Sequence, residues 1–117
     1  MKLTRTDRGG VTTITVEGDL DIYTVPELRA MLVSLPALTP ARVVLDLDRC
    51  DFLDITAIAD LLGFVKVFGL GGGTLAFACT AERPLGAFRT AGLLGVLDIY
   101  ETVDLAVAAL DGKEAGL

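Results

Sequence analysis

The sequence predicts a single domain of the α/β class, with a mixed sheet of about five strands and about four helices. After an N-terminal antiparallel hairpin, strand-like and helix-like segments alternate along the chain. This order is typical of parallel strands joined by helical crossovers. Hydrophobic residues make up 52% of the 117 residues, which is enough to fill one core, and the length allows one domain. Residues 1–117 are therefore expected to form one unit.

The N-terminal hairpin is predicted over residues 2–7 and 11–17. Arg8-Gly9-Gly10 lies between the two strands, and glycines favour a tight turn. The second strand is the clearer of the two, because its residues alternate with a period of two and are rich in β-branched side chains.

The first helix is predicted from Val25 to about Leu35. Thr24 and Glu27 have the spacing of a capping box, in which the threonine precedes the helix and the glutamate lies in its first turn. Apolar residues then recur at helical spacing. A loop over residues 36–40 is expected to follow.

The rest of the chain alternates buried strands and helices. Short apolar runs predict the strands, and Asp54 is a favoured residue for capping the helix that begins after it. The glycine run at 71–73 predicts the end of that helix. In order, the predicted elements are a strand over 42–47, a loop over 48–53, a helix from Asp54 to about Gly69, a strand over 74–79, a helix over 82–90, a strand over 97–100, a helix from the cap Thr102 to about Leu110, ended by Asp111-Gly112, and a frayed tail over 113–117.

Charge and composition exclude several function classes. Lys and Arg number 10 against 16 Asp and Glu, and the net charge of −6 gives no basic footprint for DNA or RNA. The chain has no His, which removes the commonest general base and the commonest metal ligand. We therefore expect a protein that binds a partner, with no catalytic residue, no cofactor and no direct contact with nucleic acid.

Four aspartates, Asp46, Asp48, Asp51 and Asp54, follow one another closely after the predicted strand over 42–47. Carboxylates at the end of a strand can hold Mg²⁺. The series lacks the glycine and the late glutamate of a Ca²⁺-binding loop. Asp46 is better explained as a strand-end residue and Asp54 as a helix cap, so no metal site is predicted.

Two cysteines, Cys50 and Cys79, are expected to be buried thiols, with a redox pair as the alternative. The N-terminus is polar and does not resemble a signal peptide. The longest apolar stretch, residues 55–70, contains Asp60 and Lys66 and is too polar to span a bilayer. A cytoplasmic protein with no membrane contact is expected.

The helix after Asp54 has an unusual outward face. At 3.6 residues per turn, one side carries the expected core stripe, and the opposite side carries Thr56, Ala59, Asp60, Gly63, Phe64 and Val67. That face has a single charge, small residues that would allow another backbone to approach, and apolar side chains that would be buried on contact. Two explanations stay open. Another helix of the same domain covers this face, or a partner protein or second copy of the chain binds it.

Thr56 is a candidate for modification. It lies in the first turn of the helix, where a phosphoryl group would meet unpaired backbone N–H groups and the positive end of the helix dipole. The same group would place negative charge in an apolar contact face. Thr56 is therefore a candidate binding switch, or simply a residue suited to a first turn.

Four stretches, taken together, resemble the STAS domain family, and in particular the bacterial anti-sigma-factor antagonists. Each is similar to a family pattern, and they occur in the right order over nearly the whole chain. They are Gly18-Asp-Leu-Asp21-Ile-Tyr-Thr24, Val43-Val-Leu-Asp-Leu47 with Phe52-Leu-Asp54, Gly71-Gly-Gly-Thr-Leu, and Phe88-Arg-Thr-Ala-Gly92-Leu93.

The resemblance implies a STAS-like fold and a regulatory function. Proteins of this kind bind an anti-sigma factor, often a serine kinase, and so free a sigma factor for transcription. Together with the outward helix face, the resemblance gives the candidate partner-binding residues: Asp21, Thr24, Asp54, Ile55, Thr56, Ala57, Ala59, Asp60, Gly63, Phe64 and Val67. Asp21 and Thr24 have an alternative, purely structural explanation.

The sequence departs from the family pattern at the phosphorylation site. The family has Asp-Ser-Ser/Thr-Gly-Leu and phosphorylates the residue after Asp, whereas this chain has Asp54-Ile-Thr-Ala-Ile58. Ile55 cannot be phosphorylated, and Thr56 keeps the second hydroxyl. The chain is expected to be an antagonist without a switch, an antagonist that uses Thr56, or a diverged STAS scaffold that associates with itself or with another partner.

Overall fold

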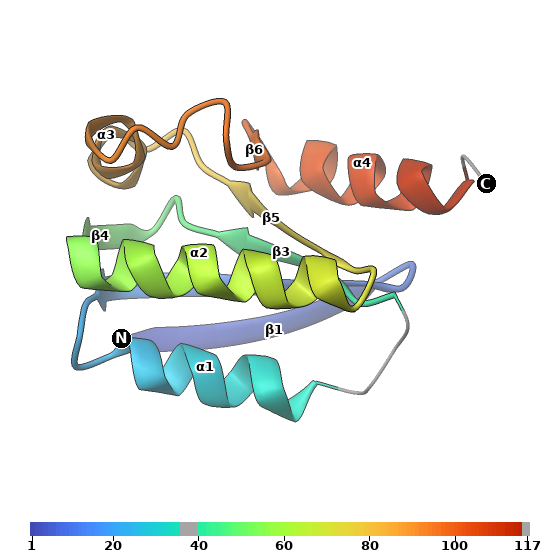
Figure 1. Cartoon of the computed structure of the whole chain (residues 1–117), viewed down its shortest axis with the longest axis horizontal. Helices are drawn as coiled ribbons and strands as arrows, with labels where there is room; N and C mark the ends of the chain where they lie inside the picture. Colours follow the sequence, from blue (N-terminus) through green and yellow to red (C-terminus); the bar gives the residue numbers. More distant parts are fainter. Residues whose placement is uncertain (36–39, 116–117) are drawn as a thin grey trace.

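The computed structural model describes residues 1–35 and 40–115, which form a six-stranded mixed sheet and four helices (Figure 1). The strands are β1 (Lys2–Arg8), β2 (Val11–Leu20), β3 (Arg42–Asp46), β4 (Cys50–Leu53), β5 (Thr74–Ala78) and β6 (Ile99–Tyr100). The helices are α1 (Val25–Ser34), α2 (Ile55–Leu70), α3 (Glu82–Thr90) and α4 (Val103–Ala115). The predicted α/β class is confirmed.

The sheet order is β1-β2-β3-β5-β6, and β4 pairs with the end of β2. β1 and β2 are antiparallel, and the other pairings are parallel, as the alternation of elements predicted. Parallel strands end at the same edge of a sheet, so the segments that follow β2, β4 and β5 gather at one end of the molecule.

Side chains on the two faces of the sheet enter two cores. Along β3, Val43 and Leu45 face α1, α2 and α3, whereas Val44 faces α4. The larger core includes Phe77 of β5 and Phe88 of α3, whose rings meet edge to face with centroids 5.5 Å apart. Figure 1 shows α1 and α2 side by side on one face of the sheet, where they form one helical layer.

Strand β4 lies where the sequence predicted a loop over 48–53, and that prediction is wrong. Cys50 and Leu53 are buried, and the two residues between them are exposed. The strand pairs with β2, which continues to Leu20 across an irregularity at Gly18, where φ is +97°. Four residues with a charged Asp51 give too weak an alternation to predict a strand, and the pairing with β2 supplies the missing stability.

Helix α4 continues through Asp111 and Gly112 to Ala115, so its predicted end near Leu110 is wrong. Its predicted cap is confirmed, because the Leu105 amide donates to the Thr102 hydroxyl over 3.1 Å. Gly costs only about 1 kcal/mol relative to Ala inside a helix, and that cost does not stop a helix that packs against the sheet. The predicted frayed tail is helical to residue 115. Residues 116–117, and 36–39 of the predicted loop, lie outside the described residues.

Smaller boundaries also shift: α1 ends at Ser34, α2 at Leu70, and β6 is limited to Ile99–Tyr100. In the part of the chain that the structure describes, no helix is long and apolar enough to cross a membrane.

Candidate functional site

Helix α2 begins where β4 ends, and Asp54 fixes this junction. The Ala57 amide donates to the Asp54 carboxylate over 2.8 Å, which confirms the predicted N-cap. The Asp54 amide donates to the Leu20 carbonyl of β2 over 3.3 Å. The first residues of the helix, Ile55 and Thr56, are thereby held in the open, and the Ile55 side chain is 71% exposed.

The loop between β2 and α1 lies beside this junction and is tied by Asp21 and Thr24. The Asp21 carboxylate accepts from the Tyr23 and Thr24 amides at 2.9 and 3.0 Å. The Thr24 hydroxyl donates to the Asp19 carbonyl and accepts from the Asp21 amide, both over 2.9 Å. These bonds hold the loop so that it presents Ile22 and Tyr23 to solvent, the latter 88% exposed.

The predicted capping box at Thr24 is wrong. Thr24 precedes α1 but has helical dihedral angles and makes no side-chain bond to the first turn. Its hydroxyl is engaged by the loop instead, so its spacing from Glu27 has no capping role. Asp21 and Thr24 thus stabilise this loop through hydrogen bonds, which agrees with the structural explanation that the sequence left open for them.

The outward face of α2 is divided by helix α1. Arg29 of α1 pairs with Asp60 at 3.4 Å and lies over the Phe64 ring, 5.7 Å from its centroid. A helix of the same domain therefore covers part of the face. Thr56, Ala59 and Val67 are exposed, and a side chain at Gly63 would meet no atom within 4 Å. Ala57 is fully buried in the core, so its side chain cannot belong to an exposed contact surface.

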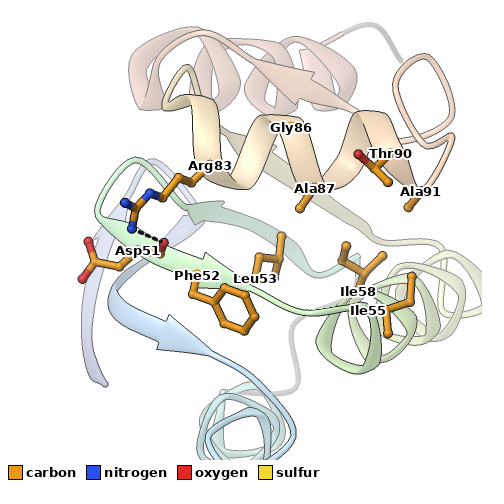
Figure 2. A pocket seen from close by; sticks show the side chains of 10 residues that line it. All are labelled: Asp51, Phe52, Leu53, Ile55, Ile58, Arg83, Gly86, Ala87, Thr90 and Ala91. Carbon is orange, nitrogen blue, oxygen red and sulfur yellow. Dashed lines mark hydrogen bonds between the residues drawn. The ribbon is translucent and has the colours of Figure 1, made fainter.

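A groove lies between the α2 N-terminus and α3, and its volume is about 440 Å³. We call it the α2–α3 groove (Figure 2). It is lined by Asp51, Phe52, Leu53, Ile55, Ile58, Arg83, Gly86, Ala87, Thr90 and Ala91. Phe52 lies on β4 and half of its side chain is exposed. The sequence analysis did not name Phe52, Ile22 or Tyr23 as contact residues. Which side chains of β4 and of the loop after β2 are exposed depends on tertiary packing, and β4 itself was expected to be a loop.

Helix α3 is held in place by groups from the preceding strand–strand junction. The Asp48 carboxylate accepts from the amides of Thr80 and Ala81, at 2.6 and 3.0 Å, directly before α3 begins. The Arg83 guanidinium donates to the Asp51 carbonyl over 3.4 Å. These contacts set the position of α3 as one wall of the groove.

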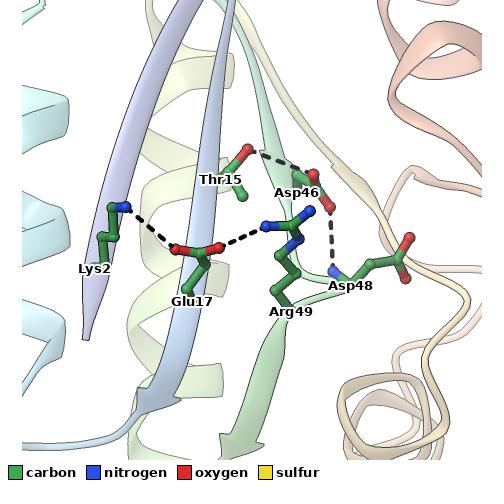
Figure 3. A network of polar contacts seen from close by, with 6 residues as sticks. All are labelled: Lys2, Thr15, Glu17, Asp46, Asp48 and Arg49. Carbon is green, nitrogen blue, oxygen red and sulfur yellow. Dashed lines mark hydrogen bonds and ion pairs between the residues drawn. The ribbon is translucent and has the colours of Figure 1, made fainter.

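The four aspartates Asp46, Asp48, Asp51 and Asp54 do not form one site, and each makes different contacts. Figure 3 shows Asp46 accepting from the Asp48 amide at 3.2 Å and from the Thr15 hydroxyl at 3.4 Å. Asp54 caps α2, and Asp48 holds the segment directly before α3. Within the described ranges, no three His, Cys, Asp or Glu residues gather where they could hold a metal ion.

The rest of the Figure 3 network is an ion-pair chain. The Glu17 carboxylate lies 2.8 Å from Arg49 and 3.9 Å from Lys2. The hydrogen bond from Arg49 lowers the pKa of Glu17. These charged side chains lie on β1, on β2 and next to β4, so this part of the molecule is polar and offers no apolar contact surface.

Both cysteines are buried and carry free thiols. Burial raises the pKa of Cys79 to about 11, and burial also raises the pKa of Cys50. A reactive cysteine needs a thiolate, which these surroundings disfavour. The structure therefore supports buried structural thiols over a redox pair.

Comparison with known proteins places this geometry in a family. The family model of the STAS domain matches residues 2–106. The chain belongs to the STAS domain family. A curated relative of this STAS chain, the anti-sigma-B factor antagonist of Bacillus subtilis, is 30% identical over 86 residues, which cover 74% of this chain and 78% of the relative. The Staphylococcus epidermidis protein of the same name is 27% identical over 79% of this chain and 85% of its own.

Solved structures agree on the STAS fold. A crystal structure of an anti-sigma factor antagonist from Mycobacterium paratuberculosis matches with a TM-score of 0.81 and 24% identity over 93% of this chain and 92% of the other. The murine solute carrier 26 family member A9 anion transporter matches with a TM-score of 0.74 and 13% identity, over 92% of this chain but 18% of the transporter. Such different proteins share the fold, so the fold alone does not decide the partner.

Proposed function

We propose that this STAS chain is an anti-sigma-factor antagonist that binds an anti-sigma factor through the N-terminus and exposed face of α2 and so releases a sigma factor. The observation that carries the proposal is the exposed apolar cluster at this end of the molecule. Its members are Ile22, Tyr23, Phe52 and Ile55, contributed by three neighbouring segments. The 30% identity to the B. subtilis antagonist over most of both chains supports a protein partner of the same class.

The energetics favour a protein partner for this cluster. Fully burying one large apolar side chain contributes roughly 1.5–3 kcal/mol, so covering several of them gives a substantial favourable term. Asp54, Ile55, Thr56, Ala59, Gly63 and Val67 lie at or beside the proposed contact surface. Asp21 and Thr24 contribute by fixing the conformation of the loop between β2 and α1. Asp60 and Phe64 contact Arg29 of α1, which covers them on this face. The net charge of −6 is consistent with an effect on transcription that passes through a protein.

A matched pair of exposed residues tests the proposal. Ile55 and Val96 have similar exposed fractions, 71% and 65%, but Val96 lies in the segment between α3 and β6, outside the proposed surface. Purified anti-sigma factors of the source organism are titrated one by one with the wild type, Ile55→Asp and Val96→Asp by calorimetry. We expect one factor to bind the wild type and Val96→Asp alike, and to bind Ile55→Asp at least about tenfold more weakly, a difference of 1.4 kcal/mol. Absence of binding by the wild type, or equal losses in both variants, contradicts the proposal.

Regulation by phosphate at Thr56 is a further part of the proposal. Thr56 is exposed in the first turn of α2, a turn that contains no acidic residue. Negative charge there interacts favourably with the helix dipole, by about 0.3–1 kcal/mol, but opposes burial in an apolar interface. We therefore expect Thr56→Glu to keep or raise stability while weakening binding of the anti-sigma factor.

Mass spectrometry after incubation with a kinase anti-sigma factor and ATP checks the modification itself. The expected result is one added phosphate, absent in Thr56→Ala. No added phosphate would leave an antagonist without a switch, with Ile55 in the place of the family's acceptor.

Self-association is the alternative function, and one observation favours it. Val33 of α1 and Val67 of α2 are both largely exposed at the rim of a second groove, which Arg29, Leu32, Phe64 and Phe68 also line. Sedimentation equilibrium decides between the two functions. A mass that rises with concentration supports a scaffold, and a constant monomer mass excludes it.

A further inference from the structure

Arg83 differs from every other arginine of the described residues. The chain has seven arginines, and in the described part six of them lie within 4.0 Å of a carboxylate oxygen. The pairs are Arg5–Asp7, Arg8–Asp104, Arg29–Asp60, Arg42–Asp111, Arg49–Glu17 and Arg89–Glu82. Arg83 instead donates one N–H group to a neutral acceptor, the Asp51 carbonyl. In a chain with a net charge of −6, an exposed arginine without a carboxylate partner is unexpected.

The position of Arg83 in helix α3 is also unfavourable. It is the second residue of that nine-residue helix, next to the N-terminal end. A cation at a helix N-terminus opposes the helix dipole, whereas an anion is stabilised there. The helix dipole therefore does not favour an arginine at this place. Its hydrogen bond to the Asp51 carbonyl helps to position α3 and uses one N–H group, and the rest of the guanidinium faces solvent, where another molecule can reach it.

The surroundings of Arg83 indicate what that contact is. Arg83 and Asp51 lie at one end of the α2–α3 groove, and apolar side chains such as Phe52, Ile55 and Ala87 line most of the rest (Figure 2). The Arg83 guanidinium bonds to the Asp51 carbonyl and forms no ion pair with the Asp51 carboxylate. A guanidinium group binds a carboxylate through two parallel N–H···O bonds, and the attraction is stronger where apolar walls exclude water. The groove thus joins an arginine that has no carboxylate partner to a largely apolar floor.

We propose that the α2–α3 groove binds a short segment of the anti-sigma factor in which an apolar side chain lies next to a carboxylate. The apolar side chain enters between Phe52, Ile55 and Ala87, and the carboxylate pairs with Arg83. This inference rests on the proposed function for the identity of the partner, but its chemistry comes from the groove alone. Because the rest of the protein is acidic and repels acidic segments, Arg83 selects where such a segment binds.

A small probe tests the chemistry of the groove without any partner protein. N-acetyl-leucine carries an apolar side chain and a carboxylate, and N-acetyl-leucinamide is its neutral counterpart. Both are titrated into the full chain labelled with ¹⁵N, and amide shifts are followed by NMR. We expect N-acetyl-leucine to shift amides of the groove with a dissociation constant of about 1–10 mM, as its size allows, and the amide to bind severalfold more weakly.

Charge reversal supplies the matched variants. Lys66 of α2 is exposed, lines neither groove, and also forms no ion pair with the described residues. Arg83→Glu and Lys66→Glu therefore change the net charge equally. We expect Arg83→Glu to abolish the preference for N-acetyl-leucine and Lys66→Glu to keep it. Thermal unfolding provides the second readout. Arg83→Glu loses the hydrogen bond to the Asp51 carbonyl but places an anion at a helix N-terminus, so the midpoint is expected to change little.

The outcomes separate the groove from the proposed function. The inference is supported if N-acetyl-leucine shifts the groove amides, and if Arg83→Glu weakens the anti-sigma factor at least about tenfold while Lys66→Glu does not. The inference is overturned if the two probes bind alike, or bind outside the groove. This holds even if the Ile55→Asp experiment supports the proposed binding of an anti-sigma factor. If the groove prefers N-acetyl-leucine but no anti-sigma factor binds the wild type, the proposed function and the assignment of the occupant are both overturned.

Discussion

Gly63 and Gly73 differ in the space available for a side chain. Gly63 lies inside α2, and an added Cβ would meet no atom within 4 Å. Gly73 lies in the turn before β5, and an added Cβ would overlap the Ala41 carbonyl oxygen and lie 3.1 Å from the Ala41 nitrogen. The Ala41 carbonyl cannot move freely, because it accepts from the Thr74 amide over 2.8 Å.

The two glycines therefore predict opposite effects of the same substitution. Gly63→Ala is expected to stabilise the chain by about 0.5–1 kcal/mol, because alanine loses less conformational entropy in a helix. Gly73→Ala is expected to destabilise it by about 1–3 kcal/mol, the usual range for overpacking. Urea unfolding at neutral pH measures both, and changes of the same sign would contradict the geometry.

At the scale of elements, sequence reasoning predicted what depends on local pattern and missed what depends on distant partners. The alternation along β2 and the Asp54 cap of α2 are properties of neighbouring residues, and both are confirmed. Strand β4 depends on pairing with β2, some thirty residues earlier in the chain. The continuation of α4 past Gly112 is a helix boundary that the local stop signal did not predict.

The candidate site shows the same division. The helix face and its exposed residues could be read from the period of α2. The contacts of Arg29 with Asp60 and Phe64 could not be predicted from that period, because they depend on how α1 packs against α2 in the tertiary fold. The α2–α3 groove also escaped prediction, since its walls come from β4 and from a helix some 30 residues later.

Asp48 is the clearest contact between distant elements that bears on the site. From the β3–β4 turn, its carboxylate accepts from the amides of Thr80 and Ala81 and so holds the segment directly before α3. Asp48→Ala is expected to cost about 0.5–1.5 kcal/mol for each of the two lost hydrogen bonds, and Asp48→Asn, whose amide oxygen can still accept, is expected to recover most of it. Hydrogen exchange should become faster at the amides of Thr80 and Ala81.

Asp19→Ala is the matched control for Asp48→Ala. Asp19 is exposed, and truncating its side chain changes the net charge equally without touching the segment before α3. Equal exchange rates at the start of α3 in the two alanine variants would show that Asp48 does not hold this helix.

At the scale of the whole molecule, exposed apolar side chains are unevenly distributed. Of the ten exposed large apolar side chains in the described residues, seven lie on α1, α2, β4 and the loop before α1, and three lie elsewhere, Leu94, Val96 and Leu105. Ion pairs such as Glu17–Arg49 lie on the strands. A partner that approaches the helical layer therefore meets apolar surface, and the strand surface stays hydrated. This asymmetry favours one docking face over many weak ones.

The dependence of stability on pH follows from the whole set of titrating groups. Without His, no side chain has an ordinary pKa between about 5 and 8, so the free energy of unfolding should be nearly constant there. Hydrogen bonds lower the pKa of Asp7, from Thr12 and Arg5, and of Glu17, from Arg49. The stability from these two carboxylates is present at neutral pH and is lost as the pH falls below about 4.5.

At alkaline pH, the free energy of unfolding is expected to fall as the pH rises. Burial raises the pKa of Cys79 from 9.0 to about 11, so the unfolded chain releases this thiol proton while the folded chain keeps it. Unfolding therefore becomes easier as the pH rises through this interval. Urea unfolding at a series of pH values should show a plateau followed by a decline above about pH 9. Cys79→Ala should make that decline shallower, even if the variant is less stable at every pH, and an unchanged slope would contradict a buried neutral thiol at this position.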